Sequence, residues 1–337
     1  MNNPLARTSP RPGRTRKVLA WCCSVCLASL VCVLAAEEKE TPIGPRWWPS
    51  EWGADDQRGA ANRITAAKVK QAASLIRAGK VYQLGRVYEQ GMPMPPGSKR
   101  HYSLTIPGSP TGVSGHLVYH DELFSGEIGQ VGTQFDGLGH VGVRVGQEDI
   151  FYNGVSRSQL QGSYGLAKLG VEHVGVFFSR GVLIDSASYV GVERLPSGRA
   201  ITASDLEGAL RKQNLEIREG DIVLIRTGHG RLWMTDNDAY SNGEPGIDMS
   251  AARWLAERKI AMVGADTWAV EVTPPAKADE PFGVVHMHLL VRHGIYLLEN
   301  LDLEELAADK AYEFAFIYAP LRLKGATGSP GNPIAVR

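Results

Sequence analysis

Residues 130–140 read Gln-Val-Gly-Thr-Gln-Phe-Asp-Gly-Leu-Gly-His. The three glycines of this stretch permit tight turns and close backbone approach. Asp136, a carboxylate, and His140, an imidazole, lie four residues apart in it. A carboxylate and an imidazole on one turn can bind a divalent metal ion or polarise a water molecule. The alternative is structural, with Asp136 capping the turn and His140 packed in the core.

The chain on both sides of this stretch alternates predicted helices and strands. Apolar periodicity and end signals predict helices at 65–78, 204–214, 250–258, 285–293 and from 302, and strands within 174–187 and at 81–84, 221–227, 260–265, 295–298 and 314–319. Residues 90–115 are rich in Gly, Pro and Ser and are expected to form a long loop. This order predicts an α/β or α+β fold in a single domain at 65–325, with an irregular lead-in at 37–64 and a C-terminal tail at 326–337.

The composition is that of a globular protein. The chain has 337 residues, 43% apolar and 21% charged, which is enough for a sizeable buried core. Basic and acidic residues number 36 each. No overall basic field therefore favours nucleic acid as a partner.

Residues 1–36 have the pattern of a secretory signal. Five basic and no acidic side chains precede an uncharged apolar run at 18–36, which ends in two alanines. We expect cleavage after Ala35 or Ala36, a location in the periplasm or outside the cell, and no membrane contact afterwards. The alternative is an uncleaved N-terminal anchor, because the run is long enough to cross a bilayer.

All four cysteines lie at 22–32, inside this leader. Without residues 1–36 the chain has 31 basic and 36 acidic residues, a net charge of −5, and no thiol. Nucleophilic cysteines, thiolate metal ligands and disulfides are therefore excluded from the mature domain. Histidine and carboxylate side chains become the candidate ligands.

A second cluster of such residues lies later in the chain. The segment His286-Met287-His288 is followed by Glu299-Asn300. Glu299 is expected at a strand end and His286 on the preceding helix, so the two can meet. The alternative is a histidine in the core and an acid on the surface.

Residues 130–140 resemble the H-x-G-T-H-x-D-x-P-x-H signature of the cyclase-like hydrolases, which include bacterial kynurenine formamidase and isatin hydrolase. The resemblance covers roughly residues 46–325, in the family's order. The further segments that carry it are Trp52–Asn62, Arg180–Asp185, Gly220–Gly228, Gly264–Trp268 and Glu299–Leu301.

The resemblance implies a swivelling β/β/α fold and a metal-dependent amide hydrolase of the arylformamidase type, which acts in tryptophan catabolism to kynurenine, usually as a homo-oligomer. It makes Asp136, His286 and Glu299 the ligands of a zinc or manganese ion, with His288 in place of His286 if the helix phase differs. It makes His140 the proton shuttle.

Phe135 and Trp268 are candidates for contact with an aryl substrate, although such aromatic residues more often lie in the core. The chain departs from the family signature at both histidine-ligand positions, which are Gln130 and Gln134, and at the proline position, which is Leu138. A glutamine oxygen is a poorer zinc ligand than imidazole. The corresponding metal site is therefore expected to be weakened, altered or absent, with both glutamines as possible ligands.

Two other functions remain open. The glutamines are compatible with a metal-free protein that binds a small molecule in a decayed site. A lactone-forming cyclase that uses His140 and a carboxylate alone is the third candidate. All three functions require a small-molecule partner.

Overall fold

Four apolar segments form the parallel centre of a nine-stranded mixed sheet. In the computed structural model, β7 (Phe177–Asp185), β9 (Ile222–Arg226), β11 (Met262–Ala265) and β12 (Tyr296–Glu299) are hydrogen-bonded in that order and in parallel. Almost all of their residues are buried, as expected for parallel strands that are covered on both faces. The predicted α/β class is confirmed.

Antiparallel strands extend this centre on both sides, in the order β1-β15-β13-β7-β9-β11-β12-β4-β14. Three small two-stranded sheets, β2 with β3, β5 with β6 and β8 with β10, complete the described strands. Their bounds are β1 Val81–Gln83, β2 Tyr102–Thr105, β3 Leu123–Gly126, β4 Gln134–Asp136, β5 Val143–Val145, β6 Glu148–Ile150, β8 Ala200–Ile201, β10 Gly246–Ile247, β13 Glu313–Tyr318, β14 Gly328–Pro330 and β15 Ile334–Val336.

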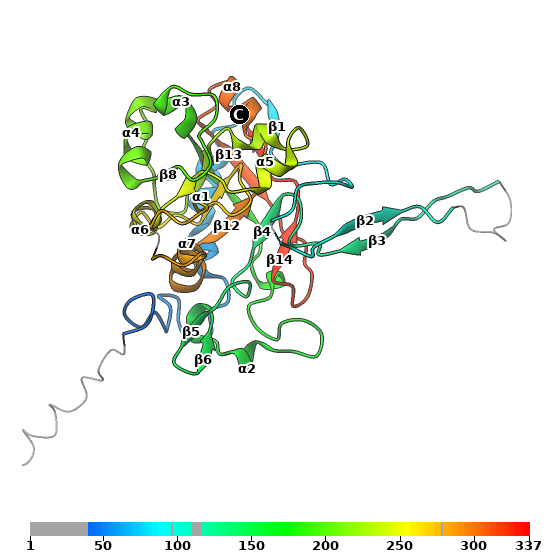
Figure 1. Ribbon diagram of the computed structural model, residues 1–337, viewed down its shortest axis with the longest axis vertical. Coiled ribbons are helices and arrows are strands. Elements are labelled where there is room, and N and C mark those ends of the chain that lie inside the picture. The colour runs from blue at the N-terminus through cyan, green and yellow to red at the C-terminus, as the bar shows by residue number, and fades with distance from the viewer. Residues whose placement is uncertain (1–39, 96, 109–115, 278) are drawn as a thin grey trace, which may run out of the picture. The chain divides into compact units, whose positions relative to one another are not determined.

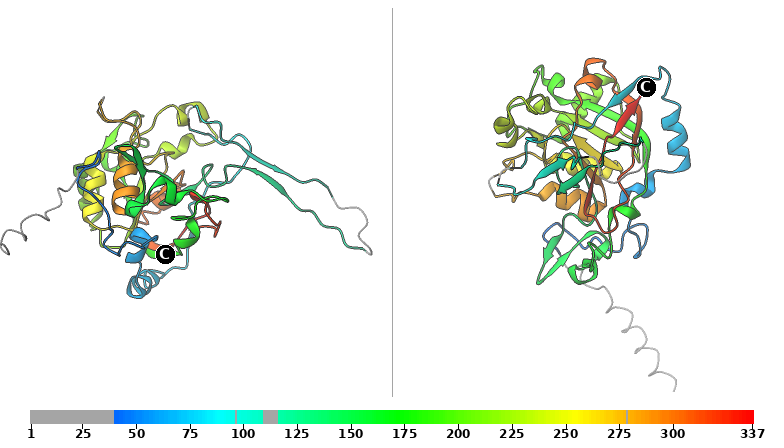
Figure 2. Two further views of the ribbon diagram at one scale, coloured as in Figure 1. Left: turned by 90° about the horizontal axis from the view of Figure 1, so that it is seen from below. Right: turned by 90° about the vertical axis from the view of Figure 1, so that its right-hand side faces the viewer.

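Helices cover both faces of the large sheet. The α-helices are α1 Ala66–Ala73, α2 Arg157–Leu160, α3 Ser186–Val190, α4 Ala203–Gln213, α5 Asn237–Ser241, α6 Met249–Glu257, α7 Val284–His286 and α8 Glu304–Ala308. Short 3-10 helices are η1 Gly59–Arg63, η2 Tyr152–Gly154, η3 Val171–His173 and η4 His229–Leu232. Helix α4 packs against α3 and α6, whereas α1 lies against β7 and β13 on the opposite side of the sheet (Figure 2).

The expected helix at 285–293 divides into two kinds of helix. Residues Val284–His286 form α7, and a π-helix, η5 (Met287–Arg292), continues directly from it. A π-turn inserts an extra residue per turn and re-aims the side chains beside it, which is why such turns are frequent at functional sites.

The structure describes residues 40–337 except 96, 109–115 and 278. The predicted leader at 1–36 lies outside the described residues. Within the described part, no helix is long and apolar enough to cross a membrane. Residues 41–337 form one compact unit.

Residues 326–337 belong to the sheet, which corrects their interpretation as a tail. Strand β14 pairs with β4, and β15 lies between β1 and β13. The β-branched and apolar residues Ile334-Ala335-Val336 explain the second strand, since Ala335 and Val336 are buried in it.

The segment expected as a long loop at 90–115 contains a strand. Strand β2 pairs with β3 in antiparallel register, Tyr102 opposite Gly126, and the pair extends away from the rest of the unit as an arm (Figure 1). We call residues 101–108 and 116–127 the arm. Apolar side chains exposed on it include Leu104, Ile106, Leu117, Val118 and Leu123.

Candidate metal centre

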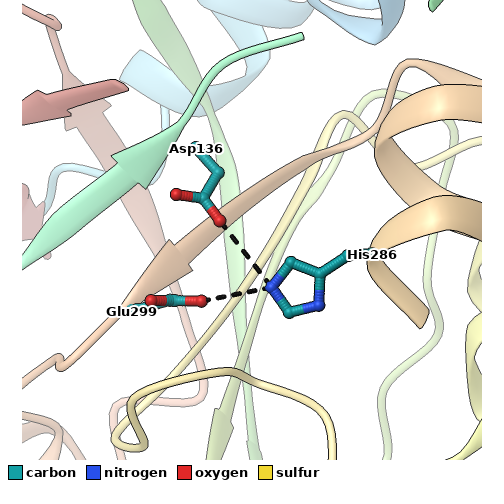
Figure 3. Close-up of side chains that lie close together, drawn as sticks. All are labelled: Asp136, His286 and Glu299. Carbon is teal, nitrogen blue, oxygen red and sulfur yellow. Dashed lines mark hydrogen bonds and ion pairs between the residues drawn. The ribbon is translucent and has the colours of Figure 1, made fainter. Parts of the chain in front are cut away.

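The signature strand β4 lies next to β12, so two segments far apart in sequence share one edge of the site. In their antiparallel register Asp136 is opposite Leu297 and Gln134 is opposite Glu299. His286 approaches from the end of α7 (Figure 3). The three elements bring Asp136, His286 and Glu299 together, as expected from the sequence.

Residues with a left-handed backbone conformation flank the two strands of the site: Gly132 precedes β4 and Asn300 follows β12. Asn300 has φ of 57°, and its side-chain amide donates to the Gly132 carbonyl at 2.7 Å. Gly132 itself has φ of +62°, and a Cβ there would lie 2.8 Å from the Tyr88 ring. Glycine is therefore required at 132 for both its conformation and its close packing.

The three candidate ligands converge on one point. His286 Nε2 lies 3.4 Å from Glu299 Oε1 and 3.8 Å from Asp136 Oδ2. One ligand atom of each residue lies within 4.8 Å of the others, and all three residues are buried. Two carboxylates and one imidazole form a three-ligand set typical of a catalytic divalent-metal site with an open position.

Asp136 provides the test of whether a metal ion fits. Both of its carboxylate oxygens are buried, and neither has a hydrogen-bond partner within the described chain. A buried carboxylate without partners is costly, because it loses its hydration without compensation. A divalent cation between Asp136, His286 and Glu299 would remove that cost, so the residues fit the ion.

Glu271 fixes the orientation of His286. Its Oε1 lies 3.1 Å from His286 Nδ1, and its two oxygens accept from the backbone N–H groups of Gly283 and Val285 at 2.7 and 2.9 Å. The carboxylate thus binds the first turn of α7 and the ring at its end. Because Nδ1 is occupied by Glu271, Nε2 is left to face Asp136 and Glu299. A carboxylate at the other ring nitrogen is the usual partner of a metal-binding histidine.

The charges at the site shift the pKa values of its members. Burial lowers the pKa of His286, but the charge and hydrogen bond of Glu271, with those of Glu299, outweigh burial and raise it well above its ordinary value. Burial and the nearby Asp136 carboxylate raise the pKa of Glu299 to about 8. Such a carboxylate cluster is stabilised by a bound cation.

The two glutamines make specific contacts in the site. Gln134 donates to Glu299 Oε2 at 2.6 Å, and Gln130 lies 3.3 Å from His140 Nδ1 through its amide. Gln134 thereby contacts a candidate metal ligand, and Gln130 contacts the candidate proton shuttle. His140 Nε2 is 3.8 Å from Asp136 Oδ1. Burial lowers the pKa of His140, which favours the neutral form of the ring.

A cavity of about 360 Å³ opens onto these residues. His140, His286 and Glu299 line it, and Trp268 and Phe282 add an aromatic wall with ring centroids 6.0 Å apart. Its volume is in the range of small-molecule sites. The predicted place of Trp268 beside a substrate agrees with this geometry.

Two sequence expectations do not agree with the structure. Phe135 is fully buried and stacks on Tyr296 with centroids 4.9 Å apart, so it belongs to the core and not to the cavity wall. On a strand, alternate side chains point to opposite faces, and Phe135 lies on the face opposite its neighbours Gln134 and Asp136. His288 packs on His293 with centroids 4.6 Å apart, which leaves His286 as the histidine of the cluster.

Three residues of the site escaped the sequence analysis, namely Arg100, Glu271 and Phe282. Glu271 gave one signal, because it is an acid between the apolar residues Val270 and Val272. Arg100 and Phe282 lie in irregular segments without a periodic pattern, so no local signal placed them at the site.

Comparisons with known proteins agree with this geometry. A family model described as "Putative cyclase" matches residues 82–272, more than half of the chain. The chain belongs to this cyclase family. Curated relatives include the kynurenine formamidases of Bacillus cereus, 31% identical over 150 residues, and of Bordetella petrii, 30% identical over 115 residues. These matches cover 44% and 33% of this chain and span only 63% and 47% of the two relatives.

Solved structures extend the likeness to most of the chain. A protein described as a novel cyclase is 37% identical with a TM-score of 0.75, and the match covers 85% of this chain and 96% of that one. Isatin hydrolase A from Ralstonia solanacearum is 21% identical with a TM-score of 0.56, covering 81% and 96%. At that identity, the likeness to isatin hydrolase shows a shared fold. The expected fold of the cyclase-like hydrolases is confirmed.

Proposed function

We propose that this member of the cyclase family is a metal-dependent hydrolase of an aryl or cyclic amide, of the arylformamidase type. The observation that carries the proposal is the buried Asp136 carboxylate, which lacks a hydrogen-bond partner and faces His286 and Glu299. The names of its relatives, kynurenine formamidase and isatin hydrolase, support an amide as the bond that is cleaved.

One divalent ion per chain, zinc or manganese, would be held by Asp136, His286 and Glu299. Such an ion supplies a Lewis acid that polarises a carbonyl and lowers the pKa of a water molecule. Gln134 occupies one side of Glu299 by its hydrogen bond at 2.6 Å. The carboxylate is thereby held in place, and its Oε1 is the oxygen directed at His286.

His140 is the residue that moves the proton in this proposal. The Oε1 of Gln130 is buried and has no hydrogen-bond partner in the described chain. Flipping the Gln130 side-chain amide places this oxygen at His140 Nδ1, where it accepts a hydrogen bond from Nδ1–H. His140 Nε2 is then free to accept a proton from water and to return it to the leaving nitrogen. Its lowered pKa keeps the ring in the neutral form that this step requires.

An assay of the purified protein with N-formylkynurenine and isatin, with and without added Mn²⁺ or Zn²⁺, tests the proposal. We expect turnover that depends on the metal and falls by about 10²–10⁴-fold in His140→Ala. Elemental analysis of the same samples is the control. Turnover without metal, full activity of His140→Ala, or no stoichiometric metal with no hydrolysis would contradict the proposal.

We further propose that the chain is exported and that its basic, apolar N-terminal segment directs it to the periplasm or outside the cell. Mass spectrometry of the protein from a periplasmic fraction tests this directly. A mature N-terminus at residue 36 or 37 supports cleavage. An intact segment in a membrane fraction supports an anchor, and an intact soluble cytoplasmic protein contradicts export.

A further inference from the structure

Among the described residues that line the cavity at the candidate metal centre, Arg100 is the one arginine or lysine. We propose that Arg100 selects substrates that carry a carboxylate on or near the aromatic ring. This inference rests on the proposed function and adds to it the charge of the substrate.

The guanidinium of Arg100 is anchored but keeps free donors. Its Nη1 donates to the Gln130 carbonyl at 3.0 Å, which holds the side chain beside the signature stretch. No acidic side chain of the described chain forms an ion pair with it, whereas the buried Arg180 and Arg226 are paired with Asp221 and Asp185. A guanidinium has five N–H donors in a planar fork that matches a carboxylate.

The charge balance of the cavity favours an anion. Asp136 and Glu299 together carry two negative charges when a divalent ion binds between them, so the ligand set becomes neutral. Glu271 lies behind His286, where its oxygens are occupied by the ring and by two backbone N–H groups. Arg100 is then left as the unbalanced charge at the cavity wall.

Arg100 is also close enough to act on the centre. Gln130, to which Arg100 is hydrogen-bonded, has its side-chain amide 3.3 Å from His140 Nδ1. Arg100 also lines the same cavity as His140, His286 and Glu299. A substrate anion that binds Arg100 therefore lies in the same cavity as the reacting groups.

The aromatic wall supplies the second part of the recognition. Trp268 and Phe282 lie at an interplanar angle of 34°, and both face the same cavity as Arg100. A flat ring can rest on this wall while its carboxylate binds Arg100 and its amide lies at Asp136, His286 and Glu299. A cavity of about 360 Å³ is large enough for one substituted ring.

Matched probes that differ by one charge test the inference. N-formylanthranilate carries a carboxylate beside the formamide, and formanilide lacks it. For Arg100→Gln we expect kcat/KM for N-formylanthranilate to fall about 10–100-fold, mostly through KM, because a charge-assisted bond is lost. Formanilide turnover changes less than about threefold. Arg100→Lys keeps part of the selectivity, since it keeps the charge but not the fork.

Lys99→Gln is the matched control, because it removes one positive charge from an exposed neighbour that does not line the cavity. We expect it to leave both substrates unaffected. Equal loss on both probes in Arg100→Gln, or the same selectivity in wild type and Arg100→Gln, would overturn the inference.

Calorimetry separates this inference from the proposed function. Anthranilate and the neutral 2-aminobenzamide are titrated into the Mn²⁺-loaded protein, and no catalysis is needed. We expect anthranilate to bind the wild type about tenfold or more tightly than it binds Arg100→Gln, with 2-aminobenzamide unchanged. If this binding difference is seen but the protein hydrolyses neither amide, the proposed function is contradicted and the role of Arg100 is not. Equal anthranilate binding by both proteins contradicts the role of Arg100.

Discussion

Asp136 shows at the scale of one residue why the site has its chemistry. Its carboxylate is nearly fully buried, yet neither oxygen has a hydrogen-bond partner in the described chain. Gln130 and Gln134, which stand where the family signature has histidines, are bonded to His140 and Glu299. We therefore expect this site to bind one metal ion and not two.

Restoring the histidines tests this view. We expect the double variant Gln130→His and Gln134→His to bind two metal ions per chain where the wild type binds one, because imidazole is the stronger ligand for zinc. Elemental analysis of the purified proteins measures the ratio. Single variants serve as controls. Two ions bound by the wild type would contradict the single-metal site.

Glu271 contacts the candidate ligand His286 and is not among the residues that line the cavity. Glu271→Gln removes the charge while keeping the shape, so we expect metal affinity to fall about 10–100-fold, as for other partners of ligating histidines. Isothermal titration with Zn²⁺ or Mn²⁺ measures it. Glu280→Gln is the control, because Glu280 pairs with Lys277 on the surface. Unchanged affinity in Glu271→Gln would show that the contact is only structural.

The elements show how far local sequence patterns reach. The strands β7, β9, β11, β12 and β13 consist mostly of apolar residues, and the sequence predicts each of them within about three residues. The partners of β4 could not be predicted, because pairing with β12 and β14 depends on contacts made across the whole chain. Phe135 was misplaced for the same reason, since its face is set by that pairing.

The ligands were predictable in part. Asp136, His286 and Glu299 were found through a resemblance in motif order, which preserves identity and spacing. Glu271 and Arg100 were not found in this way. Arg100 lies on an irregular segment, and Glu271 contacts His286 only once α7 is folded against it. The resemblance thus pointed to the three candidate metal ligands but not to Glu271 or Arg100.

The π-helix η5 and the residue that follows it make stability depend on pH. Burial lowers the pKa of His293 from 6.5 to about 4. The unfolded chain therefore binds more protons than the folded chain between these values, so stability falls as the pH drops below about 6.5. We expect a loss of about 1–2 kcal/mol between pH 7.5 and pH 5 from this group.

Urea unfolding at pH 7.5 and pH 5 measures this loss. In His293→Gln the difference between the two pH values should shrink by that amount, whatever the absolute stability of the variant. His101→Gln is the control, because His101 is an exposed histidine on the arm. An unchanged difference in His293→Gln would assign the acid sensitivity to other groups.

At the scale of the molecule, the arm is the feature that the compact unit does not explain. Leu117, Val118 and Leu123 are more than 60% exposed on it. Exposed apolar clusters of this kind mark interaction surfaces. We propose that the arm packs on a second copy of the chain in a homo-oligomer.

Light scattering coupled to size exclusion tests this proposal. We expect the wild type to run as an oligomer and the double variant Leu117→Asp and Val118→Asp to run as a smaller species. Tyr164→Asp is the control, because Tyr164 is 92% exposed and is not one of the arm residues. A monomeric wild type would contradict the proposal.

The position of β14 determines when, during synthesis, the strand that carries Asp136 gains both of its neighbours. Strand β4 carries Asp136 and is held between β12 and β14, which come about 160 and 190 residues later in the chain. While the chain is being synthesised, residue 136 is made long before either neighbour. An ion that requires Asp136 in this position would therefore bind the folded chain and not the nascent one, and the cell compartment in which folding finishes would determine which metal is available to it.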